Sequence, residues 1–491
     1  MQCNMFAMLS IVGVVVMLNA AGCSQEPSPN YIVPFSYKPT VPHAQHISMM
    51  ATDFRHAEDP AENDWTAAHY DHLMSGDIAE FKKRDPNIKW YPYVLNLTVI
   101  QPGRRPSGAY NEMDEWFKAH PQYNFESAFL HDAAKVKDNC GPCLNCRVEA
   151  GIWRSKRWVI NPGDEGLRAF YQDRVKRIMN PPGAKYKPDG LFFDEHGSRP
   201  DWKELKLVEY PQWKDYEDDV VEMLALERQA LEPGQFIQLN TWFDISDFDA
   251  RMSIAAGGSH MENVSDPFSP LMPARWDYIE KLLSNGTFVQ MVNAWSFKFK
   301  FVPDGKEAEG RKKFAQFPPG NEKSTLMRIK MFELACYYMA VPTPAHQLAL
   351  YMANNDWDEP FSTRWVKAIE VDVGSPLSRR TVLAKGRDWA WQPYQIFSRD
   401  MQRALVLIRP SAGKQYKKYD DSSAVNVRLP SGEKWLPLYS DGTIGPAVRQ
   451  VKLRQGEAMI LLKGSMLEKA PDTAGPAAGM PDTGRPDTGR P

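Results

Sequence analysis

Two carboxylates end apolar runs of this sequence and could act on one bond. In "DGLFFDEH" the run ends in Asp194, Glu195 and His196, and in "GSHMEN" it ends in Glu262. Packing explains poorly why a buried strand should end in charged groups. Cleavage of a glycosidic bond requires such a pair, one group ionised and one protonated. We therefore expect Asp194 and Glu262 to be catalytic.

Alternation of side chains along a strand separates the two neighbouring acids. Asp194 and Glu195 point to opposite faces in regular strand geometry, so we expect Asp194 to face the cleft. Glu195 then caps the following loop or pairs with a basic residue, and His196 borders the pocket; both are counted among the substrate-binding candidates. The alternative is that Asp194 only accepts hydrogen bonds from loop amides.

Further polar and aromatic residues lie at predicted strand ends. Asn and Asp side chains bind sugar hydroxyls, and Trp offers a flat apolar face to a pyranose ring. Each residue alone is explained as well by packing or loop capping. The remaining substrate-binding candidates are Asp53, Tyr91, Tyr93, His131, Asn240, Trp242, Asn293 and Trp295.

Strand-like and helical patterns alternate along residues 46–390. Helical spacing of apolar residues is clear in "NPGDEGLRAFYQDRVKRIMN" and in "YPQWKDYEDDVVEMLALERQALEPG". Such alternation predicts an α/β fold, a (β/α)8 TIM barrel, with functional groups at the carboxyl ends of the strands. The eight expected strands lie near residue 47 and at 88–97, 127–132, 189–195, 235–240, 258–263, 287–295 and 347–354.

The C-terminal part has a different pattern. Short alternating runs separated by Pro, Gly and Asp turns predict a small antiparallel β-sandwich over 391–465. Residues 466–491 repeat Pro-Asp-Thr-Gly-Arg and are expected to be disordered, and residues 24–45 form a Pro-rich linker.

The first 23 residues are typical of an export signal. An apolar stretch ends in Ala20, Ala21, Gly22 and Cys23, which favours a bacterial lipoprotein signal with lipidation of Cys23. The alternative is an ordinary cleaved secretory signal. Either way we expect an exported protein of the cell envelope, with a lipid anchor to the membrane in the first case.

Export favours disulfides among the remaining cysteines. An alternative for their C-x2-C-x2-C spacing is a metal or iron–sulfur site, although the fourth cysteine is distant in the sequence. The disulfide candidates are Cys140, Cys143, Cys146 and Cys336.

Composition and motifs exclude several classes of protein. The net charge of -2 argues against a nucleic-acid partner. The chain has no G-x-S-x-G, P-loop, H-E-x-x-H or strand-linked G-x-G-x-x-G motif. We expect a carbohydrate substrate, no cofactor, no metal and no obligate protein partner.

The segments "PDGLFFDE", "FIQLN", "SHMEN" and "LPLYSDGTIGPAVRQVKLRQGEAMILLKG" resemble bacterial glycoside hydrolase-like TIM-barrel families, distant relatives of the alpha-amylase and alpha-galactosidase superfamily. The resemblance implies that Asp194 is the nucleophile, as in a retaining enzyme, and Glu262 the acid/base. In the amylases the acid/base follows strand five, where this chain has Asn240.

The sequence is also compatible with two other functions. One is a noncatalytic glycan-binding lipoprotein on a degenerate barrel, which would keep Trp242 and Trp295. The other is a metal-dependent hydrolase that would use His131, Asp132, His196 and His260.

Overall fold

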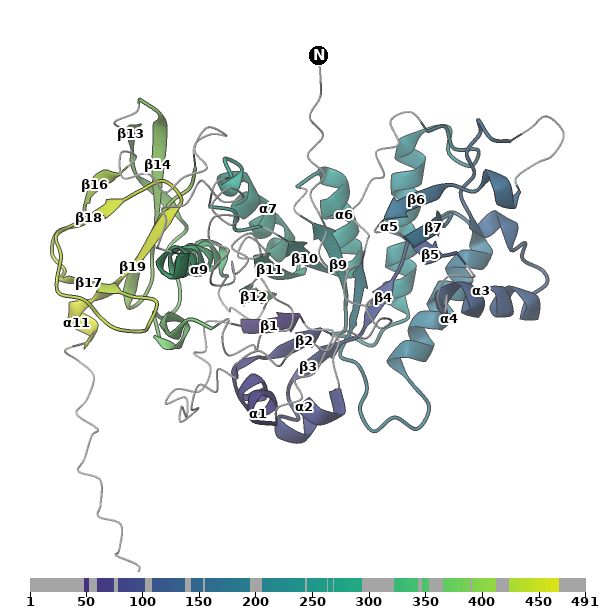
Figure 1. The fold of residues 1–491 in the computed structure, drawn as a ribbon, viewed down its shortest axis with the longest axis horizontal. Helices are drawn as coiled ribbons and strands as arrows, with labels where there is room; N and C mark the ends of the chain where they lie inside the picture. Colours follow the sequence, from purple (N-terminus) through teal and green to yellow (C-terminus); the bar gives the residue numbers. More distant parts are fainter. Residues whose placement is uncertain are drawn as a thin grey trace, which may run out of the picture.

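The fold consists of three parts in a row (Figure 1): a C-terminal β-rich domain, a central barrel, and an insertion that belongs to the barrel chain. The computed structural model describes residues 48–52, 60–74, 78–101, 108–136, 143–152, 155–194, 205–242, 245–262, 264–267, 269–293, 322–342, 347–352, 365–388, 391–411 and 424–467.

The central sheet contains nine strands, all paired in parallel, in the order β3-β2-β1-β12-β11-β10-β9-β8-β4. Its two end strands, β3 and β4, are consecutive in the chain on either side of Pro92, which lacks the N–H that a continuous strand would use. The sheet thus closes, and β3 and β4 together form one of eight barrel positions. The strands are β1 (Ser48–Thr52), β2 (His72–Met74), β3 (Lys89–Tyr91), β4 (Tyr93–Leu95), β8 (Leu191–Asp194), β9 (Ile237–Trp242), β10 (Gly257–Glu262), β11 (Phe288–Asn293) and β12 (Leu348–Met352).

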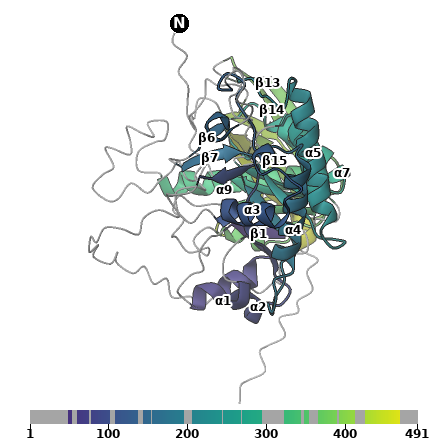
Figure 2. The ribbon, with the colours of Figure 1, turned by 90° about the vertical axis from the view of Figure 1, so that its right-hand side faces the viewer.

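Helices connect successive strands and cover the outside of the barrel. In the perpendicular view (Figure 2) α5 and α7 lie on one side of the molecule, and α1 and α2 at its lower end. Among the described helices, none has the length and apolar character to cross a membrane. The helices are α1 (Pro60–His69), α2 (Ile78–Arg84), α4 (Glu165–Met179), α5 (Trp213–Gln229), α6 (Asp247–Ala256), α7 (Met272–Ser284) and α9 (Glu322–Ala340).

Local sequence fixes the elements that lead into the strands of the site. Asp164 caps α4 by accepting a hydrogen bond from Leu167 N at 2.7 Å, as its place before the helix predicts. Ser246 caps α6 in the same way, and Gly257 ends that helix with a φ of 86°. This left-handed conformation suits glycine and turns the chain directly into β10.

An insertion separates the third and fourth barrel positions. It holds α3 (Gly108–Ala119) and an antiparallel sheet in the order β5-β7-β6, with bounds Thr98–Ile100, Ser155–Val159 and Glu149–Ile152. Apolar residues of α3, α4 and this sheet pack against the adjoining face of the barrel and form one hydrophobic core with it.

The prediction of a barrel strand at 127–132 is wrong. This segment lies in the insertion, where Glu126–Ala128 forms a single 3-10 turn and Phe129, His131 and Asp132 make isolated bridges. The missing barrel strand is β2, with only three residues, too short for an alternating pattern to stand out.

The C-terminal domain is antiparallel, as expected. A five-stranded sheet in the order β13-β14-β15-β19-β17 packs with the pair β16 and β18. The boundary expected at 390 needs correction, because β13 already belongs to this sheet. The strands are β13 (Thr381–Arg387), β14 (Pro393–Asp400), β15 (Ala404–Arg409), β16 (Val425–Arg428), β17 (Trp435–Leu438), β18 (Gln450–Leu453) and β19 (Glu457–Lys463), followed by α11 (Gly464–Leu467).

Candidate active site

Asp194 is the last residue of β8 and is held by two donors. The Tyr93 hydroxyl donates to its Oδ2 at 2.5 Å and Asn240 Nδ2 donates to its Oδ1 at 2.8 Å. The residue is only 4% exposed. Two donors in a site with little water stabilise a negative charge on this carboxylate.

Glu262 is the last residue of β10, two barrel positions from Asp194. It is 7% exposed, and Asn240 Nδ2 donates to its Oε1 at 3.1 Å. Burial, and then the charge of Asp194, raise the pKa of Glu262 to about 8 although the hydrogen bond from Asn240 opposes the shift. Glu262 is therefore protonated at neutral pH and can serve as a proton donor beside Asp194.

Asn240 lies on β9, between the strands that carry the two acids. Its amide nitrogen has two N–H donors, and the geometry directs one to each carboxyl group. Among the sugar-binding candidates it was expected to meet substrate; its side chain instead bridges the catalytic candidates. Only the pairing of β8, β9 and β10 could show this role.

A buried polar cluster lies deeper in the barrel. His260 Nδ1 donates to Gln290 Oε1 at 2.7 Å, and Gln238 Nε2 donates to the same oxygen at 2.8 Å. Gln290 Nε2 in turn donates to Met50 O at 3.1 Å. Burial lowers the pKa of His260 to about 4, so the ring is neutral. Its Nε2 is 3.9 Å from Glu262 Oε1, so an uncharged imidazole lies next to the Glu262 carboxyl group, deeper in the barrel.

Tyr91 lies inside the barrel rather than at its mouth. Its ring is 2% exposed and stacks near His72 and Phe236, and its hydroxyl is 3.1 Å from His72 Nδ1. Burial raises the pKa of Tyr91 and lowers that of His72 to about 4. A side chain at Gly190 would meet the Tyr91 ring at 2.9 Å, so this glycine allows close packing at the start of β8.

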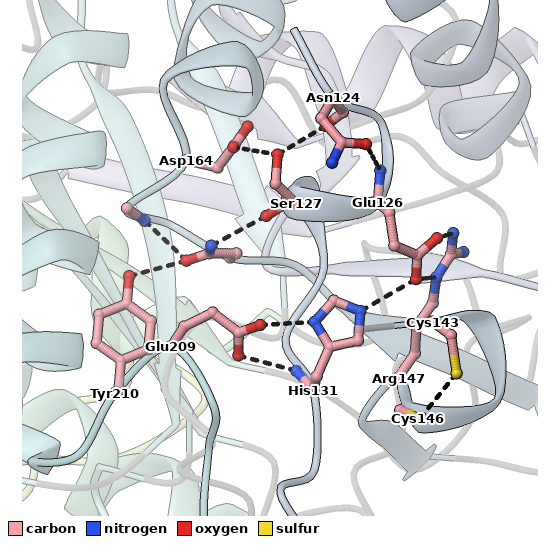
Figure 3. Close-up of polar contacts among 12 residues, drawn as sticks. Asn124, Glu126, Ser127, His131, Cys143, Cys146, Arg147, Asp164, Glu209 and Tyr210 are labelled. Atoms are coloured by element: carbon pink, nitrogen blue, oxygen red, sulfur yellow. Dashed lines mark hydrogen bonds and ion pairs between the residues drawn. The ribbon is translucent and has the colours of Figure 1, made fainter. Parts of the chain in front are cut away.

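His131 is in the insertion and does not join the barrel carboxylates. It lies between Glu126 and Glu209, with Arg147 on the far side of Glu126 (Figure 3). Burial disfavours its charge, but hydrogen bonds to the two glutamates outweigh burial and raise the pKa of His131 to about 9. Its surroundings therefore differ from those expected of a sugar-binding residue.

The described histidines give no support for the metal-dependent alternative. His131 is held by glutamates in the insertion, whereas His260 is bound to an amide in the barrel. No group of three or more His, Cys, Asp or Glu residues in the described ranges could hold a metal ion.

Three of the four disulfide candidates are described, and no disulfide joins any two of these three. Cys143 and Cys146 are neighbours, with 2.8 Å between their Sγ atoms, and Cys143 lies in the region of Figure 3. Cys336 is buried on α9, which raises the pKa of its thiol. A bridge from Cys336 to Cys143 or Cys146 is absent from the structure.

Several expected site residues cannot be placed. Trp242 and Asn293 end β9 and β11, so their backbones reach the expected end of the barrel, but their side chains lie outside the described part. Outside the described residues altogether are Cys23, Asp53, Cys140, Glu195, His196 and Trp295.

Comparisons with known proteins identify no family by sequence. No protein-family model matches the chain, and no curated protein matches it.

Solved structures align with most of this chain at very low identity. Eubacterium rectale Amy13B matches with 10% identity and a TM-score of 0.48, over 87% of this chain and 97% of that one. An alpha-amylase from Lactobacillus plantarum matches with 10% identity and a TM-score of 0.40, over 85% and 99% of the two chains.

A third match is much longer than this protein. The Paenibacillus cycloisomaltooligosaccharide glucanotransferase matches with 10% identity and a TM-score of 0.35, over 86% of this chain. The present chain spans 55% of that enzyme's length. At such identities and scores these likenesses carry no information about the reaction or substrate of this barrel.

Proposed function

We propose that the protein is a glycoside hydrolase that acts on a poly- or oligosaccharide, with Asp194 and Glu262 as its catalytic pair. The observation that supports this function is the shared contact with Asn240 Nδ2, which brings the Asp194 carboxylate oxygen and the protonated Glu262 to one end of the barrel. This combination matches what glycosidic bond cleavage requires.

The proposed mechanism is retaining. Asp194 Oδ1 and Glu262 Oε1 accept hydrogen bonds of 2.8 and 3.1 Å from the same nitrogen, so these two oxygens lie no more than about 6 Å apart. The carboxyl groups are about 5–5.5 Å apart in retaining enzymes and about 6.5–9.5 Å apart in inverting ones.

In this mechanism Asp194 attacks the anomeric carbon while Glu262 gives its proton to the departing oxygen. A glycosyl ester on Asp194 results. Glu262, now ionised, takes a proton from water, whose oxygen displaces Asp194 and restores both groups. Tyr93 and Asn240 hold the nucleophile in position throughout.

The first test replaces the nucleophile. Asp194→Asn keeps the size of the side chain but removes the attacking charge, so we expect hydrolysis of an aryl glycoside panel to fall by at least about 10³-fold. The matched control is Asp189→Asn, since Asp189 pairs with Lys82 and Lys89 ahead of the same strand. Melting curves check that both variants fold.

Two results would overturn the proposal. Hydrolysis by Asp194→Asn at the wild-type rate would exclude this carboxylate as the nucleophile. A wild-type protein that binds glycans but cleaves none of the panel would instead be the noncatalytic glycan-binding lipoprotein.

We also propose export to the bacterial cell envelope and lipid anchoring at Cys23, on the basis of the N-terminal sequence alone. Labelling of cells with a fatty-acid analogue tests it. The wild type should carry the label and fractionate with membranes, whereas Cys23→Ser should not; equal labelling of both would contradict the anchor.

A further inference from the structure

An open groove lies where the barrel meets the C-terminal domain. Its volume is about 680 Å³, which is within the usual range for ligand sites. One wall comes from the segment around Pro270 and Pro273, and the other from β13, β14 and the end of β15. The lining residues are Pro270, Pro273, Lys385, Gly386, Arg387, Pro393, Tyr394, Gln395, Phe397, Pro410 and Ser411.

The groove is on the same side of the barrel as the carboxylates. Pro270 lies in the connection that leaves β10 after Glu262 and enters α7 at Met272. Connections that follow barrel strands lie at their carboxyl ends, where Asp194 and Glu262 also are. A long chain that occupies the catalytic site can therefore extend over this side toward the groove.

The charge of the groove is one-sided. Lys385 pairs with Gln395 and Arg387 with Pro393 in the β13–β14 register, so these side chains share one face of the hairpin. Lys385 and Arg387 are exposed, and no Asp or Glu is among the described lining residues. The described part of the chain offers neither cation a carboxylate partner, so both can attract an anion.

An exposed aromatic residue is hydrogen-bonded through its backbone to one of these cations, Arg387. Trp391 is 75% exposed and has a φ of 58°, an uncommon conformation for a large side chain. Arg387 Nη1 donates to Trp391 O at 2.8 Å, and Trp391 N donates to Asp388 O at 2.9 Å. Asp388 is itself fixed by a buried ion pair with Arg409 at 3.0 Å. The fold thus fixes the backbone of this exposed residue next to Arg387, which lines the groove, at a cost in backbone energy.

We infer that the groove binds a carboxylated oligosaccharide, such as a chain of uronic acids, as a second site for the polymer that the barrel cleaves. Cations recognise the carboxylates, while the Trp391 face and the proline walls suit the apolar faces of sugar rings. An acidic peptide would satisfy the charges alone. The choice of a saccharide rests on the proposed function.

Binding is measured by calorimetry on the full chain carrying Asp194→Asn, so that no turnover interferes. The probes are a galacturonic acid hexamer, a hyaluronan hexasaccharide, maltohexaose as the neutral sugar, and a glutamate hexamer as the acidic peptide. We expect at least one acidic sugar to bind more tightly than maltohexaose and the peptide, and its affinity to weaken with salt.

Variants locate the binding site. Lys385→Gln combined with Arg387→Gln should weaken binding of the acidic sugar on the order of tenfold, and Trp391→Ala should weaken it severalfold at unchanged charge. The matched control, Arg428→Gln with Lys452→Gln, removes the same charge from the exposed face of β16 and β18 and should leave affinity unchanged.

Several outcomes overturn the inference: no binding of either acidic sugar, equal binding of maltohexaose or the peptide, or equal loss in the control variant. These results are distinct from failure of the proposed function, because a protein without hydrolytic activity can still show groove-dependent binding. If the protein hydrolyses glycosides but shows no groove-dependent binding, only the inference of a second site fails, and the proposed function stands.

Discussion

Individual residues determine the charge state of the site. Both carboxyl groups are buried, but Asp194 accepts hydrogen bonds from Tyr93 and Asn240, whereas Glu262 accepts a longer one from Asn240 and lies near the charge of Asp194. In a medium of low dielectric constant two carboxylates this close cannot both ionise easily. Proximity and the unequal hydrogen bonding thus divide the roles of nucleophile and acid between two chemically similar buried groups.

The protonation of Glu262 predicts the alkaline limb of activity. Since the proposed acid must carry its proton, kcat/KM should fall about tenfold per pH unit above a pH of about 8. Pre-steady-state rates with an activated aryl glycoside separate the steps. For Glu262→Gln the glycosylation rate should lose this limb, because the leaving group needs no proton. An unchanged limb in this variant would assign the titration to another group.

The same proton makes stability depend on pH. The folded protein keeps it up to a pH of about 8, whereas an unfolded glutamate releases it near 4.5. The folded state therefore binds more protons between these values, and stability falls as the pH rises. We therefore compare the melting temperatures of Glu262→Gln and the wild type at two pH values. The value for the variant minus that for the wild type should be larger at pH 8.5 than at pH 4.5. A constant difference would contradict the raised pKa.

At the scale of elements, the insertion anchors the chain that returns from the site. Leu207 bridges Asp132, Val208 N donates to His131 O at 3.0 Å, and Glu209 accepts hydrogen bonds from the backbone and ring of His131. Arg147 holds Glu126 on the other side (Figure 3). Its guanidinium carbon lies 3.5 Å from the Phe129 ring centre. The segment before α5 is thus fixed to the insertion by a charged network.

Glu209→Gln tests this network. The imidazolium of His131 would lose one of its two anions, so we expect the free energy of unfolding at pH 6 to fall by roughly 1–3 kcal/mol. The folded-state pKa of about 9 is above the ordinary 6.5, so this stabilisation is complete below pH 6.5 and is lost as the pH rises through 9. Chemical denaturation at pH 6 and 9.5 measures both values.

Glu115→Gln is the control, because Glu115 is exposed on α3 of the same insertion. If both variants lose the same stability at both pH values, His131 is not a charged partner of Glu209.

At the scale of the molecule, the barrel and the C-terminal domain share one core. The largest apolar cluster joins α7, α9 and the barrel strands to β14, β15 and β19. Trp276 meets Phe397 edge to face at 5.3 Å, and Arg399 Nη1 donates to Tyr338 O on α9 at 2.9 Å. Arg399 and Phe397 are both buried, so the two parts stabilise each other.

We therefore expect the two parts to unfold in one transition. Calorimetry should show a single peak that Arg399→Ala moves to lower temperature without splitting, since the variant leaves the Tyr338 carbonyl without this donor in a buried contact. Two separate peaks in the wild type would show that the shared core does not couple the domains.

The sequence alone determined the class of the fold and the location of the carboxylates. The apolar run before Asp194 has no polar break, so burial of that strand and a carboxylate at its end follow from the pattern. Capped, periodic helices such as α4 are equally local in origin. The β-rich end follows from its turns, although hairpin pairing set its first strand at β13 rather than at 391.

Tertiary structure decided which residues meet. The three residues of β2 form a barrel strand only because β1 and β3 pair with it. Residues 127–132, in contrast, are strand-like in type but make only isolated β-bridges outside the barrel sheet. Asn240 joins Asp194 and Glu262 across 46 and 22 residues of chain. Such contacts depend on parallel strand order and barrel closure, which arise from packing between distant segments and not from any local pattern.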